Sequence, residues 1–201
     1  DAAIRRLRER PFALRIDGDD PLETHCADVT AEGAGTSLQI HLRVPPRAFA
    51  ATHAAAQLAT APALAAAGNA PLFLGHRLWE ETRIALFKQA VDERGTLEGS
   101  WHPAARVSFG HGWVREGAHE LFAESVALHA PLLPACGEED PLAAVRAGAV
   151  PRLEELRLHH GTVWRWNRAI YDPADGGHLR IELRALPSGP TRADMLANAA
   201  F

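Results

Sequence analysis

The sequence has few of the features that would tie it to an oxidising compartment or a membrane. Its 201 residues include only two cysteines, Cys26 and Cys136, and these form neither a disulfide framework nor a metal-binding motif. No apolar run approaches the roughly 20 residues of a membrane-spanning helix, and no basic segment followed by an apolar one opens the chain. These absences favour a reducing cytoplasm and argue against a membrane partner.

A strong charge of one sign is also lacking, as are the common nucleotide-binding loops. The formal net charge is −4 and the pI is about 6.3, which argues against a partner made of nucleic acid. Neither a Walker motif nor a dinucleotide-binding fingerprint occurs. A bound nucleotide would therefore have to be held on the face of a sheet, together with metal ions.

Two segments alternate strictly between apolar and polar residues, which is typical of strands with two unlike faces. In residues 37–44 and 178–184 every second side chain is aliphatic, and successive side chains of a strand point to opposite faces. A solvated antiparallel sheet gives the same alternation. Recurring His and Arg, and the rigid turn that follows residue 184, favour a surface for divalent cations and polyphosphate. That surface carries Ser37, Gln39, His41, Arg43, His178, Arg180, Glu182 and Arg184.

The remaining pattern predicts one domain of the α+β class with a mainly antiparallel sheet. Apolar spacing, proline and glycine positions and the Asp140-Pro141 cap set the expected elements. Short strands are expected over 12–16 and 162–168, the latter forming a hairpin with 178–185, and a surface loop over 95–106. Helices are expected over 2–10, 47–67 with a kink or break at Pro62, 79–91, 116–132, 141–147, 151–158 and after Thr191.

His41 and Glu182 are the leading candidates for metal ligands. Magnesium prefers carboxylate oxygens, with an imidazole sometimes completing its shell. The alternative is a plain ladder of ion pairs between Glu182 and the neighbouring arginines. Arg184, Arg168 and Arg165 are candidate clamps for phosphate or carboxylate, because the planar guanidinium matches both groups. Of the three, Arg165 is the most typical of a surface arginine.

A second basic segment, residues 75–83, places Arg77 and Arg83 near a loop-to-helix junction that suits an anion. Helical salt bridges to Glu80 and Glu81 are the alternative. Weaker signals give no site: His25-Cys26 is no catalytic pair, Gly110-His111-Gly112 is no phosphate loop, and His159-His160 is interpreted as an exposed helix end.

Five blocks of the sequence, in order over about residues 10–201, resemble a bacterial branch of the glutamate–cysteine ligase family. The resemblance implies a curved, mainly antiparallel sheet like that of glutamine synthetase, with helices packed on one face. It also implies ATP, two or three Mg²⁺ ions and a glutamate-like carboxylate bound on that sheet. The five blocks are Thr36–Leu42, Gly75–Phe87, Arg106–Gly110, Gly161–Arg168 and His178–Thr191.

The resemblance implies an ATP-dependent carboxylate–amine ligase that activates the carboxylate as an acyl phosphate and transfers it to an amine such as cysteine. His41 and Glu182 would bind metal, and Arg184 would contact the ATP phosphates and the acyl phosphate. Arg168 and Gln39 would line the nucleotide side. Arg77 and Arg83 would hold the carboxylates of the substrate. Such an enzyme would act in glutathione biosynthesis in the cytoplasm. Whether it forms a homo-oligomer is left open by the sequence.

One departure from the family pattern concerns the metal shell. The family opens with a strand carrying a Glu-x-Glu pair, and nothing before residue 37 matches it. We therefore expect a partial catalytic domain with little or no ligase activity by itself. Two alternatives remain: a ligase with a different amine acceptor, and a non-catalytic module that binds an amino acid or a nucleotide.

Overall fold

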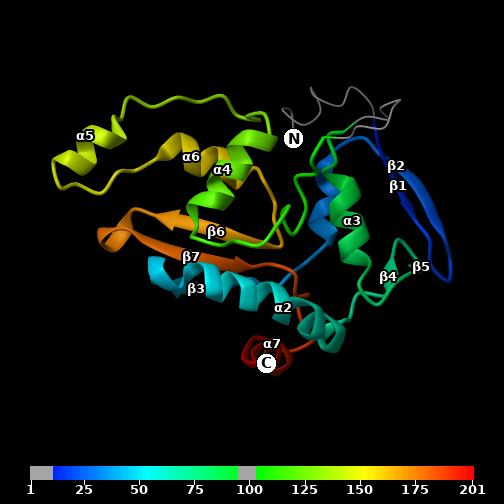
Figure 1. Cartoon of the computed structure of the whole chain (residues 1–201). Helices are drawn as coiled ribbons and strands as arrows, with labels where there is room; N and C mark the ends of the chain where they lie inside the picture. Colours follow the sequence, from blue (N-terminus) through cyan, green and yellow to red (C-terminus); the bar gives the residue numbers. More distant parts are fainter. Residues whose placement is uncertain (1–10, 95–102) are drawn as a thin grey trace. The chain divides into compact units, whose positions relative to one another are not determined.

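The computed structural model describes residues 11–94 and 103–201 and confirms the α+β class, with small antiparallel sheets (Figure 1). The chain divides into two compact units. Unit 1 comprises Asp1–Gln39, Ala59–Val107 and Arg184–Phe201, and unit 2 comprises Ile40–Leu58 and Ser108–Leu183. The helix expected over 2–10, and most of the loop expected over 95–106, lie outside the described residues.

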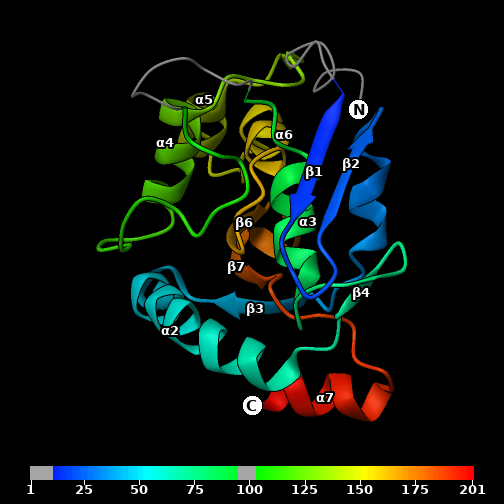
Figure 2. The ribbon, with the colours of Figure 1, turned by 90° about the vertical axis from the view of Figure 1, so that its right-hand side faces the viewer.

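Unit 1 is built on a β-hairpin that packs against a helix. Strands β1 (Phe12–Ile16) and β2 (Leu22–Cys26) pair antiparallel, and α3 (Thr82–Ala90) lies beside β1 (Figure 2). The 3-10 helix η1 (Val29–Ala34) follows the hairpin and also contacts α3. In β1 every second residue is buried, as the alternation at 12–16 predicted. The core of the unit consists of Leu14, Ile16, Leu22, Leu78, Ala85, Leu86 and Ala90.

Two smaller elements complete unit 1. Strands β4 (Leu72–Phe73) and β5 (His76–Arg77) form a short hairpin, whose turn residues Leu74 and Gly75 both have positive φ. Helix α7 (Arg192–Ala200) begins directly after its N-cap Thr191, as the sequence predicted. Its first turn carries a capping box with Asp194, in which each of the two residues satisfies a backbone N–H of the other.

Unit 2 contains the sheet that the two alternating segments predicted. Strands β3 (Ile40–Val44), β7 (His178–Leu183) and β6 (Asn167–Asp172) pair antiparallel in the order β3-β7-β6. The register places His41 opposite Glu182, and Glu182 opposite Arg168. The first strand is shorter than predicted, because residues 37–39 make only one isolated bridge, between Ser37 and Pro187.

The apolar face of this sheet packs into the core of unit 2. A 3-10 turn η2 (Pro46–Ala48) leads from β3 into α2 (Phe49–Ala67). The core joins residues of β3, α2, the segment before α4, α4 itself, β6 and β7: Val44, Phe49, Ala56, Val114, Ala118, Leu121, Ala169 and Ile181.

Helix α2 continues through Pro62 without the predicted break. Proline removes the hydrogen bond to the carbonyl four residues earlier, that of Leu58. Leu58 is exposed, so the lost hydrogen bond belongs to a turn of the helix that faces solvent.

Three further helices belong to unit 2: α4 (His119–Leu128), α5 (Pro141–Arg146) and α6 (Glu154–Gly161). The Asp140 side chain caps α5 as predicted, by accepting from the N–H groups of Leu142 and Ala143. In both ribbon views α4 and α6 lie on the β6 side of the sheet, and α2 lies on the β3 side (Figures 1 and 2).

The strand predicted over 162–168 is largely wrong, since β6 begins only at Asn167. The backbone N–H groups of Thr162 and Val163 still donate to the carbonyls of His159 and His160, so the chain keeps turning after α6. The β6–β7 hairpin turn is present and contains the 3-10 turn η3 (Ala174–Gly176). None of the helices within the described residues combines the length and the apolar character needed to span a bilayer.

Candidate functional site

Three residues that the sequence selected form one row across the sheet of unit 2. The Nε of Arg168 donates to Oε2 of Glu182 at 2.7 Å, and Nε2 of His41 lies 3.4 Å from Oε1 of the same carboxylate. Glu182 is buried, whereas His41 is exposed. The guanidinium of Arg168 also donates to the carbonyl of Gly161 at 3.2 Å. The row follows from the strand register, because residues opposite each other in a ladder share a face.

A second set of polar contacts lies towards the β6–β7 hairpin turn. Nη1 of Arg180 donates to Oδ2 of Asp172 at 2.9 Å and lies 3.2 Å from Nε2 of His178. The backbone N–H of Ala174, and then the charge of Arg180, hold the pKa of Asp172 below its ordinary value. Asp172 is therefore ionised near neutral pH, and it orients the guanidinium of Arg180 on the polar side of β7.

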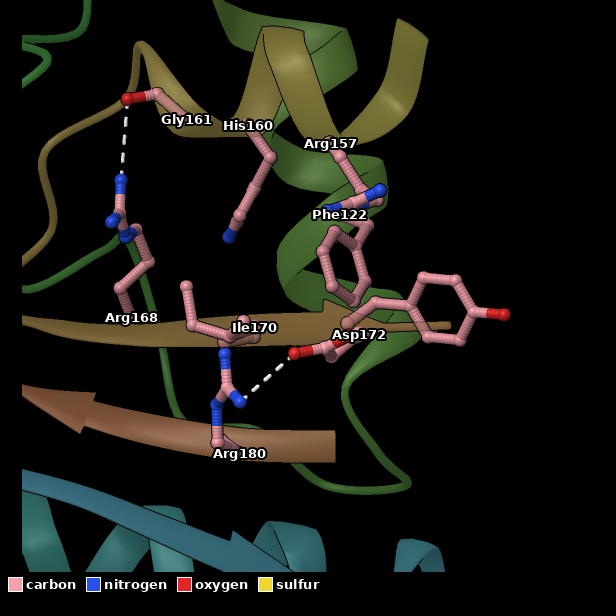
Figure 3. A pocket seen from close by; sticks show the side chains of 10 residues that line it. Phe122, Arg157, His160, Gly161, Arg168, Ile170, Asp172 and Arg180 are labelled. Atoms are coloured by element: carbon pink, nitrogen blue, oxygen red, sulfur yellow. Dashed lines mark hydrogen bonds and ion pairs between the residues drawn. The ribbon is translucent and has the colours of Figure 1, made fainter. Parts of the chain in front are cut away.

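A cavity of about 200 Å³ is formed by β6, β7, α4 and α6. Figure 3 shows Arg157 and His160 extending from α6, Phe122 from α4, and Arg168 and Asp172 from β6, with Arg180 rising from β7. Three guanidinium groups thus converge on a small space that contains one carboxylate. Such a cavity favours an anion.

One buried nitrogen at this cavity, Nε of Arg180, has no hydrogen-bond partner among the described residues. A buried N–H without a partner is costly, so this atom suits a ligand that offers oxygen atoms. The ring of His160 contacts Oγ of Ser125 and also interacts with the backbone of Ala169. Burial, followed by the charges of Arg168 and Arg165, lowers the pKa of His160 to about 3, so its ring is neutral in the physiological range.

The structure corrects two interpretations made from the sequence. His160 is only 3% exposed and is not part of an exposed helix end, because its Nδ1 lies 2.9 Å from Oγ of Ser125 on α4. Arg165 is 1% exposed and is not a surface arginine, because it forms an ion pair with Glu124 at 2.6 Å. In both cases the partner is supplied by α4.

The donor set at His41 and Glu182 fits a magnesium ion in part. Neighbouring ligands of an octahedral magnesium ion lie about 2.1 Å from the ion and about 90° apart, so they are separated by about 3.0 Å. The distance between Nε2 of His41 and Oε1 of Glu182 is 3.4 Å, which is close to this separation. Magnesium commonly keeps several waters and takes its other ligands from substrate phosphates. Two features oppose a tight site: Arg168 engages the other carboxylate oxygen, and the described residues contain no group of three or more His, Cys, Asp or Glu that could hold a metal.

The other predicted residues lie in unit 1. Gln39 is exposed and precedes β3. The guanidinium of Arg184 lies 5.6 Å from the centre of the Phe87 ring. Arg77 is exposed in β5 and pairs with Asp19 at 2.9 Å. A phosphate or nucleotide role for Gln39 and Arg184 stays a prediction.

Arg83 is buried on α3 and is held from two sides. Its Nη2 lies 3.0 Å from Oε2 of Glu81 and donates to the carbonyl of Ala185 at 2.6 Å. Burial lowers the pKa of Arg83, and the charge of Glu81 opposes that shift. Arg83 also borders a cavity of about 110 Å³. Arg77 and Arg83 have different carboxylate partners, so their joint role in holding a substrate stays a prediction.

Sequence reasoning did not select Arg157, His160 or Asp172, and it gave Arg180 no separate role. The alternation at 178–184 did place Arg180 on the polar face, so that signal was available. Arg157 and His160 belong to a helix whose neighbours come from distant parts of the chain, and no local pattern marks them. Comparisons with protein-family models, with curated proteins and with solved structures find no match for this chain.

Proposed function

We propose that this chain is part of an ATP- and Mg²⁺-dependent carboxylate–amine ligase of the glutamate–cysteine ligase type, with a glutamine-synthetase-like curved sheet and a cytoplasmic location. The observation that carries the proposal is the cavity lined by Arg157, Arg168 and Arg180. It adjoins the Arg168–Glu182–His41 row on the same sheet. A ligase that forms an acyl phosphate needs such neighbouring groups for phosphate and metal.

The arginines would act by orienting phosphate oxygens. Arg180 is fixed by Asp172, and Arg168 is fixed by Glu182 and the Gly161 carbonyl. Preorganised cations stabilise the charge that develops during phosphoryl transfer without having to reorient at that moment. The ring of His160 is neutral and adds no charge here, and its Nδ1 faces Oγ of Ser125, whose own hydroxyl donates to the carbonyl of Leu121.

His41 and Glu182 would hold the metal ion, which supplies charge neutralisation on the phosphates when bound. Glu182 is buried between its two partners, so its carboxylate direction is fixed by the sheet. His41 is exposed, which leaves room for water and phosphate on the same side. A glutamate-like carboxylate and an amine would complete the reaction, with Arg77 and Arg83 proposed for the substrate's carboxylates and Arg184 and Gln39 for the nucleotide.

The second candidate function is a non-catalytic module that binds an amino acid or a nucleotide on a ligase-like fold. The observation that favours it is the state of Glu182, whose two oxygens already face Arg168 and His41. With two donors in place of a full carboxylate set, the arginine-lined cavity could bind a phosphorylated ligand without turning it over.

Equilibrium binding of ATP with and without Mg²⁺, together with ADP release, both measured on the full-length natural protein, tests the proposal. We expect Arg180→Gln to weaken ATP binding at least 10-fold, because a charge-assisted contact contributes about 1.5–3 kcal/mol. We expect Glu182→Gln to abolish the gain in affinity that Mg²⁺ gives. Arg146→Gln, an exposed arginine at the end of α5, is the matched control and should change neither quantity.

The outcomes separate the two candidates. ADP release that requires both glutamate and an amine supports the ligase. ATP binding that depends on Arg180 without any ADP release supports the binding module. ATP affinity that is the same in the wild type, Arg180→Gln and Arg146→Gln contradicts both.

A further inference from the structure

A short loop of unit 2 holds an exposed histidine in a defined orientation. His111 follows Gly110 and precedes Gly112, and its side chain is 45% exposed. Its Nδ1 lies 2.8 Å from Oε1 of Glu124 on α4, and the same oxygen accepts from Nη1 of Arg165 at 2.6 Å. The three side chains form a network of imidazole, carboxylate and buried guanidinium.

The backbone before His111 is anchored at several points. The N–H of Trp166 donates to the carbonyl of Ser108 at 2.9 Å, and Nε2 of Gln57 donates to the carbonyl of Phe109 at 2.8 Å. Gly110 has a φ of +97°, and a Cβ there would lie 2.9 Å from Nη1 of Arg165. Only glycine fits this close approach, so the loop is pressed against the ion pair that orients the histidine.

The hydrogen bond to Glu124 fixes the tautomer of His111. Burial raises the pKa of Glu124, but the hydrogen bonds from His111 and Arg165 outweigh it and hold that pKa below its ordinary value. An ionised carboxylate only accepts, so Nδ1 of His111 donates to it, and Nε2 carries the lone pair in the neutral form of the ring. Because the side chain of His111 is exposed, a ligand can approach its ring from solvent.

Two aromatic side chains flank His111 in the sequence and are exposed to solvent: Phe109 at 45% and Trp113 at 58%. Aromatic faces attract ammonium groups. A carboxylate-backed imidazole is a good proton acceptor, because the carboxylate stabilises the imidazolium that forms. The loop therefore combines surfaces that suit a cationic amine with a group that can remove its proton.

We propose that His111, oriented by Glu124, is the general base for the amine substrate, an inference that rests on the ligase function proposed above. Nε2 of His111 takes one proton from the substrate's ammonium group, and the freed lone pair forms a C–N bond with the acyl phosphate carbon. The C–O bond to phosphate breaks, and phosphate leaves with the electron pair and the second amine proton. His111, Glu124 and the cavity lined by Arg157, Arg168 and Arg180 all belong to unit 2.

The test compares two amines in the full-length natural protein. His111→Asn keeps a side-chain N–H for Glu124 but has no basic nitrogen. With cysteine as acceptor, we expect ADP release by this variant to fall at least about 100-fold, the usual contribution of a general base. With hydroxylamine, which is already largely deprotonated at neutral pH, the loss should be less than 10-fold, and added imidazole should restore turnover with cysteine.

His119→Asn is the matched control, because His119 is an exposed histidine of the same unit that also lies near a glutamate, Glu116. It should behave as the wild type with both amines. Equal turnover of His111→Asn and wild type with cysteine overturns the general base and leaves the ligase standing. An equal loss with both amines also overturns it, by showing a structural role, and absence of any amine-dependent ADP release in the wild type overturns both proposals.

Discussion

The buried His160 makes the stability of unit 2 depend on pH in a defined direction. Its pKa is about 3 in the folded chain, compared with an ordinary value of 6.5. Between these values the unfolded chain binds a proton at this position that the folded chain does not bind. Stability therefore falls as the pH drops below 6.5, and the loss is complete only near pH 3.

The size of this effect follows from the two pKa values. Through His160 alone, lowering the pH from 7 to 5 should reduce the free energy of unfolding by about 2 kcal/mol. Lowering the pH from 7 to 4 should reduce it by about 3 kcal/mol. His53 is also buried, and burial lowers its pKa, so it contributes in the same direction. A variant is therefore needed to isolate His160.

Urea denaturation of wild type and His160→Asn at pH 7 and pH 5 measures the contribution. Asparagine can keep the contact with Ser125 but does not titrate. The variant should be less stable at pH 7, yet its free energy of unfolding should fall by about 2 kcal/mol less than that of the wild type between pH 7 and pH 5. An unchanged pH dependence would show that His160 is solvated or charged in the folded chain and would refute the reasoning.

Three further variants test other parts of the structure. Gly110→Ala should lower the free energy of unfolding, measured by urea denaturation, by about 1–3 kcal/mol, because φ is positive there and the added Cβ meets Arg165. An unchanged urea midpoint would refute that close approach. Glu81→Gln should lower the free energy of unfolding by about 3 kcal/mol in the same measurement, since it leaves the buried Arg83 without its carboxylate. A decrease of less than about 1 kcal/mol would show that the ion pair is solvated. Phe12→Ala, a fully buried position in β1, should lower the melting temperature through a loss of about 3–5 kcal/mol, and calorimetry would show an unchanged transition if the hairpin does not pack as described.

The sequence predicted those features that depend on short-range periodicity. Strict alternation in two segments placed His41 and Glu182 on one face, and the structure pairs these residues directly. The caps at Asp140 and Thr191 were also visible, because they depend on residues within three positions.

Features that depend on distant partners were not visible. Arg165 is buried because Glu124, 41 residues earlier, neutralises it. His160 is buried because Ser125, 35 residues earlier, lies against its ring. Pro62 did not end α2, and Leu58, whose carbonyl loses its helical donor, is exposed to solvent.

The most direct test of the central claim is ADP release by the full-length natural protein with ATP, Mg²⁺, glutamate and a panel of amines that includes cysteine. The ligase account predicts that ADP forms only when glutamate and an accepted amine are both present, and that Arg180→Gln and Glu182→Gln reduce the rate while Arg146→Gln does not. ADP formation that is absent, or that does not depend on glutamate and an amine, would contradict it.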